Sequence, residues 1–445
     1  MGLILTIVVI LCFEVIAFGI FRKLYFISIL NVLLVFSYLF LPYIIYYTGY
    51  NKFELVSYRG IKEPPQLEYY IAIVAVYLFL NTSFYVAFFW KKIQIFDNRK
   101  KLVFSTNMYV IVLILSLVLY GFYISSVGFI GSLSSGFEIR SGDLDLGAQG
   151  VAIRMLPITT TIMIFLVYDK VVLHTRSHTV LLVIYVLLFL FWTLSTAGRS
   201  AIVTPVITVV IAYFLYAKTH RIRFNLKKIG IAGITFGFLV LFALYGKSFF
   251  TVLPFIIKMD FAEIINNYET YRELNNLSDY NILSNLVKEY GQGYYTLDSL
   301  FKNGDFDFLY FRDVWDAIRD YVPERVFNVN IDLYPSVSRI NTARLFDGYD
   351  AASYPPGYLG FLYYSLGISG IILGSLAMGF ITARLNVFYM RYRHNNPFAI
   401  LWTSILLLTI ASYFINGDVR VFSRDAFLSI IIVLVLWKID KIKFR

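Results

Sequence analysis

Residues 311–326 read FRDVWDAIRDYVPERV and belong to a long polar passage that runs from Lys247 to Pro356. This passage holds sixteen acidic and ten basic residues, a net charge of −6. The rest of the chain consists mostly of long runs of hydrophobic residues. It holds 29 basic and 12 acidic residues, a net charge of +17. In a membrane protein such an asymmetry reports which side of the membrane each segment faces. The pattern predicts a membrane scaffold with one large external loop at residues 247–356.

The composition excludes a soluble globular protein, because 59% of the 445 residues are hydrophobic and only 15% are charged. The net charge of +11 does not indicate nucleic acid as a partner, since the basic residues fall in short clusters between hydrophobic runs. The single cysteine, Cys12, lies inside an apolar run. It therefore offers neither a disulfide within the chain nor a thiolate metal cluster.

An apolar helix crosses about 30 Å of hydrocarbon in about 20 residues, and this length predicts about eleven transmembrane helices. We expect an all-α polytopic membrane protein in three parts: helices 1–8 in residues 1–246, the external loop in 247–356, and helices 9–11 in 357–445. The predicted spans cover residues 3–20, 24–48, 69–90, 107–127, 151–169, 179–196, 201–217, 229–246, 366–389, 397–415 and 425–438.

The loops predict the orientation, because cytoplasmic loops collect Lys and Arg. Every second loop is basic, and together these loops and the C-terminal tail hold 21 such residues. The alternation places the N-terminus outside, the C-terminus inside and the 247–356 loop outside. Within that loop, a helix is predicted from Phe311 to Val322, ended by Pro323. Its apolar face carries Phe311, Val314, Trp315, Ile318 and Val322, and its polar face carries Arg312, Asp313, Asp316, Arg319 and Asp320.

Five arginines lie at the predicted outer ends of spans, where the positive-inside rule depletes them: Arg140, Arg154, Arg199, Arg420 and Arg424. An ionised side chain at the membrane boundary is costly and is usually kept for function. A guanidinium binds phosphate through two parallel hydrogen bonds, so several that converge favour a diphosphate ligand. The alternative is that each arginine snorkels to water or pairs with a nearby carboxylate.

An external general base has to be a carboxylate, a tyrosine or the substrate itself, because all four histidines fall in predicted cytoplasmic loops. Asp418 is one candidate, since it shares a short connection with Arg420 and Arg424, although a plain ion pair is the alternative. The other candidates are Asp313, Asp316, Asp320, Glu324, Asp347, Asp350 and Asp425.

No metal or other cofactor is expected. The chain contains no phosphate-binding Gly-x-x-x-x-Gly-Lys-Ser/Thr motif and no Gly-x-Gly-x-x-Gly motif. Two Asp-x-Asp pairs, Asp143 with Asp145 and Asp305 with Asp307, have the spacing of metal clamps in sugar-nucleotide enzymes. This spacing is common in acidic loops, so it does not by itself predict a metal site.

Four passages, in order, resemble the Wzy-type O-antigen and capsule repeat-unit polymerases of bacteria, including the enterobacterial common antigen polymerases. The first two are Thr196-Ala-Gly-Arg-Ser-Ala-Ile202, at the start of a span, and Ile318-Arg-Asp-Tyr-Val-Pro323, in the large loop. The third is Ala352-Ser-Tyr-Pro-Pro-Gly-Tyr-Leu-Gly360, which leads into Leu366-Gly-Ile-Ser-Gly-Ile-Ile-Leu-Gly374. The fourth is the pair Arg420 and Arg424 before the last span. Together with the span count and loop position, the resemblance covers most of the chain.

The resemblance implies a GT-C-like helical fold and metal-independent polymerisation at the outer face of the bacterial cytoplasmic membrane. Donor and acceptor would be oligosaccharide repeat units on undecaprenyl diphosphate, and a chain-length regulator would be a possible partner. It implies phosphate-binding roles for Arg199, Arg420 and Arg424 and a substrate role for Arg319. Arg140 and Arg154 are candidates from topology alone. Asp418 is our first candidate for the general base, and Asp320 is the second.

Two other classes remain open. An O-antigen ligase, or another lipid-linked glycan transferase, would share the scaffold, but ligases typically use a histidine in the large external loop, and none occurs between Lys247 and Pro356. A flippase or other transporter would be expected to have short loops on both faces and charged residues at mid-membrane depth. Here the polar residues concentrate on one predicted face, which favours a polymerase.

Overall fold

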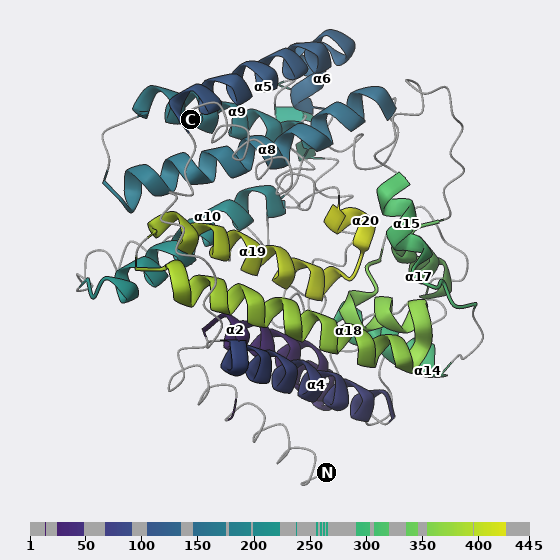
Figure 1. Cartoon of the computed structure of the whole chain (residues 1–445). Coiled ribbons are helices and arrows are strands. Elements are labelled where there is room, and N and C mark those ends of the chain that lie inside the picture. Colours follow the sequence, from purple (N-terminus) through teal and green to yellow (C-terminus); the bar gives the residue numbers. More distant parts are fainter. Residues whose placement is uncertain are drawn as a thin grey trace. The chain divides into compact units, whose positions relative to one another are not determined.

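The computed structural model describes eleven stretches of the chain and a few isolated positions between them. The stretches are residues 25–48, 67–90, 105–134, 146–174, 178–196, 199–222, 291–302, 307–319, 335–345, 354–394 and 396–423. All regular elements within these stretches are helices, and none is a strand (Figure 1). The predicted all-α class is therefore confirmed for this part of the chain.

Six described helical segments are long and apolar enough to cross a membrane. They are Phe26–Ile44, Leu67–Phe89, Thr106–Val127, Ile202–Thr219, Gly357–Tyr392 and Pro397–Asn416. The chain is thus a membrane-embedded helical protein, as the composition predicted. The predicted spans 3–20, 229–246 and 425–438 lie outside the described residues, so the total of about eleven spans stays a prediction.

The helix boundaries follow the hydrophobic runs of the sequence closely. The second predicted span, residues 24–48, is a continuous helical stretch made of α2 (Tyr25–Leu34), the π-helix η1 (Val35–Phe40) and α3 (Leu41–Thr48). The next spans correspond to α4 (Leu67–Trp90), α5 (Thr106–Val127), α8 (Leu146–Val171), α9 (Thr179–Thr196) and α10 (Arg199–Thr219). The last two correspond to α18 (Gly357–Tyr392) and α19 (Pro397–Asn416). Length and hydropathy are therefore enough to place these helices.

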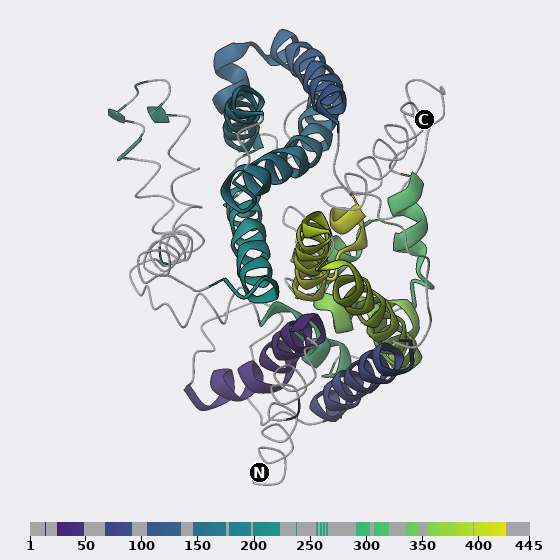
Figure 2. The ribbon, with the colours of Figure 1, turned by 60° about the vertical axis from the view of Figure 1, so that its left-hand side comes forward.

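The chain divides into two compact units. The second unit comprises residues 99–280, 392–405 and 424–445, and within it α8 packs against α5, α9 and α10 (Figure 2). Aromatic residues fill its core: the Tyr120 and Trp192 rings lie 4.2 Å apart, and the Tyr185 hydroxyl donates to the carbonyl of Tyr109 at 2.8 Å. A phenolic hydroxyl in an apolar core needs such a partner, and a backbone carbonyl provides it.

The first unit comprises residues 1–98, 281–391 and 406–423 and contains the polar helices of the predicted external loop. These are α14 (Gln292–Lys302), α15 (Arg312–Arg319) and α17 (Val337–Leu345), which gather near the end of α18 that begins at Gly357 (Figure 1). The short helix α20 (Val419–Phe422) follows α19 and packs against α15. The polar helices therefore form a cap at one end of the spanning helices of this unit.

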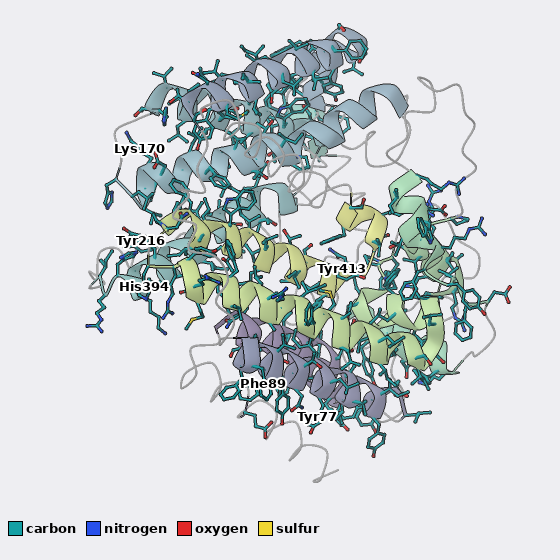
Figure 3. The ribbon with its side chains drawn as sticks, viewed as in Figure 1. Tyr77, Phe89, Lys170, Tyr216, His394 and Tyr413 are labelled. Atoms are coloured by element: carbon teal, nitrogen blue, oxygen red, sulfur yellow. The ribbon has the colours of Figure 1, made fainter. Side chains whose placement is uncertain are left out.

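The outer face of α4 in this unit presents apolar side chains to the outside. Tyr77 and Phe89 on α4 are 53% and 65% exposed and point away from the neighbouring helices (Figure 3). Large apolar side chains at these exposures fit a helix whose outer face meets lipid. The inner face of α4 lies against α18, where Gly379 allows close contact with the Phe79 carbonyl.

Helix α18 is broken at Leu366 and Gly367, where Gly367 has a φ of +61°. The sequence placed the start of a span at residue 366, which coincides with this break. The segment before α15 satisfies two carbonyls next to it: the N–H of Leu309 donates to Tyr364 at 2.9 Å and the N–H of Tyr310 to Ser365 at 3.0 Å. A carbonyl without a hydrogen bond would be costly at the membrane boundary. The loop therefore supplies the donors that the interrupted helix lacks at this point.

Three glycines form a junction at the base of the cap. A Cβ on Gly293 would lie 2.9 Å from Cζ of Tyr38 and 3.1 Å from Cα of Gly357, and a Cβ on Gly417 would lie 2.8 Å from the Tyr358 nitrogen. The Tyr38 hydroxyl accepts the N–H of Leu359 at 3.2 Å at the same junction. The chains approach so closely that a side chain larger than hydrogen would push them apart.

The junction predicts opposite effects for two helical glycines. Gly293→Ala is expected to lower the thermal unfolding midpoint in detergent, because Tyr38 and Gly357 have to move. Gly121→Ala on α5, where nothing lies within 4 Å of a new Cβ, is the matched control. Alanine is favoured over glycine in a helix by roughly 0.5–1 kcal/mol, so the control is expected to keep or raise the midpoint. Equal midpoints for the two variants would contradict the close approach.

Candidate functional site

The candidate site begins with the turn between α19 and α20. Gly417 has a φ of +64° and ends α19, and its N–H donates to the Tyr413 carbonyl at 2.7 Å. Asp418 follows and caps α20, because its Oδ1 accepts the N–H of Arg420 at 2.9 Å. Tyr413 is labelled near this end of α19 in Figure 3. The turn therefore fixes the position of the Arg420 backbone, from which the side chain extends toward α15.

The second carboxylate oxygen of Asp418 accepts a short hydrogen bond from the Ser338 hydroxyl on α17. Asp418 is 2% exposed and Ser338 is fully buried. Both oxygens of Asp418 are therefore held by the protein, one by a backbone N–H and the other by a hydroxyl. This arrangement suits a residue that positions α20 against α17.

Arg420 lies between two buried carboxylates of α15. Its Nε is 2.8 Å from Oδ1 of Asp313, and its Nη2 donates to Oδ2 of Asp316 at 2.9 Å. The Arg420 side chain is 13% exposed, and those of Asp313 and Asp316 are 2% and 1% exposed. Buried charges of this kind are stable only when they are paired, so this contact fixes α15 against α20.

Two further arginines of α15 surround Asp316. Nη1 of Arg319 donates to Oδ1 of Asp316 at 3.0 Å, and Nε of Arg312 lies 4.0 Å from its Oδ2. Unlike Arg420, these arginines are 44% and 54% exposed. They can therefore meet a soluble or membrane-bound anion while they keep their contact with Asp316.

The electrostatic environment raises the pKa of Asp313 to about 7. Burial is the main cause, because it disfavours the charged form, and the neighbouring charges of Asp418 and Asp316 act in the same direction. Arg420 and the backbone of Val337 oppose the shift. Asp313 is consequently a carboxyl group that can gain or lose a proton near neutral pH.

A stripe of buried polar residues on α17 connects the site to the rest of the cap. Asn341 donates to the Thr296 hydroxyl at 2.9 Å and to the Tyr354 carbonyl at 3.1 Å, and its amide oxygen accepts from the Tyr364 hydroxyl at 3.1 Å. Thr342 accepts the N–H of Tyr354 at 2.6 Å. These residues were not predicted as functional from the sequence, although Ser338, Asn341, Thr342 and Leu345 have the spacing of one helical face.

Helix α15 departs from the simplest expectation for an amphipathic helix. In an amphipathic helix of a folded protein the apolar face usually packs against the core and the polar face lies outside. In the structure Asp313 and Asp316 on that face are buried against Arg420, and the apolar Trp315 and Ile318 are 67% and 56% exposed. The need to pair Arg420 outweighs the burial of these apolar side chains.

The remaining predicted residues are placed only in part. The structure brings together Asp418, Arg420 and Arg319. Arg199 is the first residue of α10, α9 ends at Thr196, and Arg154 lies within α8. The side chains of Arg154 and Arg199, and Arg140, Asp320 and Arg424 as whole residues, lie outside the described part of the chain. No group of three potential metal ligands gathers among the described side chains.

Comparison with known proteins identifies no relative: no family model, no curated protein and no solved structure matches the chain.

The paired charges predict a pH-dependent loss of stability in Arg420→Met. Removing one partner of a buried ion pair typically costs about 3–5 kcal/mol, because the remaining charge is left unpaired. The cost should be greatest above pH 7, where Asp313 is ionised, and smaller at pH 5, where it is neutral. Thermal unfolding in detergent at both values measures the difference. Arg339→Met, at an exposed position on α17, is the control that should change little at either pH. A cost for Arg420→Met that is the same at both values would contradict the placement of Asp313.

Proposed function

We propose that this chain is a membrane-embedded glycosyltransferase that joins lipid-linked oligosaccharide repeat units into a polysaccharide. The donor would be a growing glycan on undecaprenyl diphosphate, and the acceptor would be a single repeat unit on the same lipid. The proposal places the reaction at the outer face of the bacterial cytoplasmic membrane. It rests on the resemblance of the sequence to Wzy-type polymerases and on the chemistry of the site described above.

One observation carries the proposal: Asp313, a buried carboxyl group, lies 2.8 Å from Arg420 in the short helix that follows a helix long enough to span the membrane. Burial raises the pKa of Asp313 to about 7. A general base works best when its pKa is near the operating pH. Lipid-linked glycans present their sugars at the membrane surface, which is where such a base would have to lie. Within this proposal we therefore give the role of the base to Asp313.

In this mechanism a hydroxyl oxygen of the acceptor sugar attacks the anomeric carbon of the donor. The new bond forms between these two atoms, and the bond between the anomeric carbon and the diphosphate oxygen breaks. The lipid diphosphate leaves with the electron pair, and the hydroxyl proton passes to Asp313. No metal is needed for this balance of atoms and charge.

The geometry favours Asp313 over Asp418 as the proton acceptor. From the sequence, Asp418 was the first candidate for this role, because it is close to Arg420 in the chain. Both oxygens of Asp418 accept hydrogen bonds within the protein, which suits a positioning role. We therefore propose that Asp418 holds α20 in place, that Arg420 keeps Asp313 partly ionised, and that Asp313 accepts the proton.

The charge that develops on the diphosphate requires a cation nearby. Arg420 is already paired with two carboxylates, so its side chain has little free capacity for a phosphate. Arg319 is half exposed at the edge of the same cluster and is better placed for this role. We propose Arg319 for this contact. The phosphate-binding roles of Arg199 and Arg424 stay predictions that rest on the family resemblance.

The first test compares wild type, Asp313→Asn and Asp298→Asn in membranes that contain an undecaprenyl diphosphate repeat unit. The products are resolved by length at matched expression. Wild type should give a ladder, and Asp313→Asn should slow it by about 10²–10⁴-fold, the usual contribution of a general base. Asp298 is an equally buried, ion-paired carboxylate on α14, 3.1 Å from Lys302, and its substitution should preserve the ladder.

The second test is the pH profile of the same reaction. The ionised form of Asp313 is the active base, so the rate should rise with pH through about 7 and level off above it. Arg420→Lys keeps the positive charge but loses the planar guanidinium that contacts both carboxylates. The midpoint of the pH profile should therefore move to higher pH in this variant. A flat profile between pH 5 and 8 would exclude Asp313 as the base. Single units that never lengthen in wild type would favour a transporter over a polymerase.

A further inference from the structure

Helix α15 and the segment before it expose an unusual number of large apolar side chains for a polar loop. Tyr310 is 71% exposed, Trp315 67%, Ile318 56% and Phe308 42%. The buried side of the same helix is charged and faces Arg420, as described above. The apolar side therefore cannot turn inward without breaking the ion pairs, and in water it would remain uncovered.

The part of this apolar surface that precedes α15 adjoins exposed apolar residues of α18. The Phe308 ring lies against Gly367, within 3.1 Å of where a Cβ would stand, and 6.3 Å from the Tyr310 ring. The residues that follow Gly367 on α18 are also exposed: Ile368 at 47%, Ile372 at 37% and Leu373 at 58%. The hydrogen bonds from Leu309 and Tyr310 to α18 hold the segment at this level.

The charges around the apolar surface fit the headgroup region of a bilayer. Arg312 and Arg319 lie at the two ends of α15 and are each about half exposed. Such side chains can place their stems along apolar lipid and their guanidinium groups among phosphates. Tryptophan and tyrosine are enriched at the same depth, because their rings are apolar and their tips are polar. A short helix with these two faces is typical of an interfacial segment.

We propose that α15 lies in the membrane surface, with Tyr310, Trp315 and Ile318 inserted among the lipid headgroups. The exposed apolar surface is then covered by bilayer lipid, the same environment that covers the outer face of α18. One consequence is that the charged side of α15, which holds Asp313 and Asp316, faces inward at the level of the headgroups. This inference stands without the proposed enzymatic activity.

Site-directed spin labelling of the full chain in phosphatidylethanolamine and phosphatidylglycerol vesicles tests the proposal. Cys12→Ser removes the single native cysteine, and a nitroxide is then attached at Ile318→Cys or, separately, at Trp315→Cys. Leu373→Cys is the lipid-facing reference, and Arg339→Cys, exposed on α17, is the aqueous reference. Collision rates with oxygen, which partitions into lipid, and with a water-soluble nickel complex give the depth of each label.

We expect the ratio of oxygen collisions to nickel collisions at positions 318 and 315 to be well above that at position 339 and below that at position 373, because the headgroup region lies between water and the hydrocarbon core. A nickel accessibility equal to that of position 339 would show that the surface faces water and would overturn the proposal. Low accessibility to both reagents, with an immobilised spectrum, would show that protein covers the surface, and this also contradicts it. Spin dilution with unlabelled chain would then identify a second copy as the cover.

Discussion

The contact of Arg420 with Asp313 and Asp316 is the interaction on which the cap of the first unit depends. It joins α20, which follows a spanning helix, to α15, which lies more than a hundred residues earlier in the chain. Arg420 is the shared partner of two buried carboxylates, so its removal would take the nearest cation away from Asp313. The contact therefore specifies one arrangement of α15. It also explains why the charged face of that helix is buried and its apolar face exposed.

Backbone groups impose a second constraint on the same region. Helix α18 is broken at Gly367, where the segment before α15 contacts it. The N–H groups of Leu309 and Tyr310 donate hydrogen bonds to the carbonyls beside the break. The glycines of the junction let three chain segments approach at backbone distance. Backbone hydrogen bonds thus join the polar loop to the apolar helix α18. The loop belongs to the structure of the spanning helices and is not a separate domain placed on top of them.

The sequence predicted the spanning helices well, because a run of about 20 apolar residues has few alternatives to a membrane helix. It predicted that Arg420 and Asp418 would lie together, because they are two residues apart. It could not predict that Asp313 and Asp316 pair with Arg420, since nothing local distinguishes them from the other acids of the loop. The stripe on α17 shows helical spacing in the sequence, but its hydrogen-bond partners come from three other segments, which only the fold brings together.

The position of Asp313 also connects stability to chemistry. Its folded pKa of about 7 is above the ordinary value of 3.8, so the folded chain binds more protons than the unfolded chain between these values. Raising the pH through this range therefore reduces the stability of the fold, and the ionised carboxylate is the less favourable form. Arg420 reduces the free-energy cost of ionising Asp313 but does not remove it. A carboxylate kept in a costly ionised state gains more from accepting a proton than one fully stabilised by its partners, and this is the property that a general base requires.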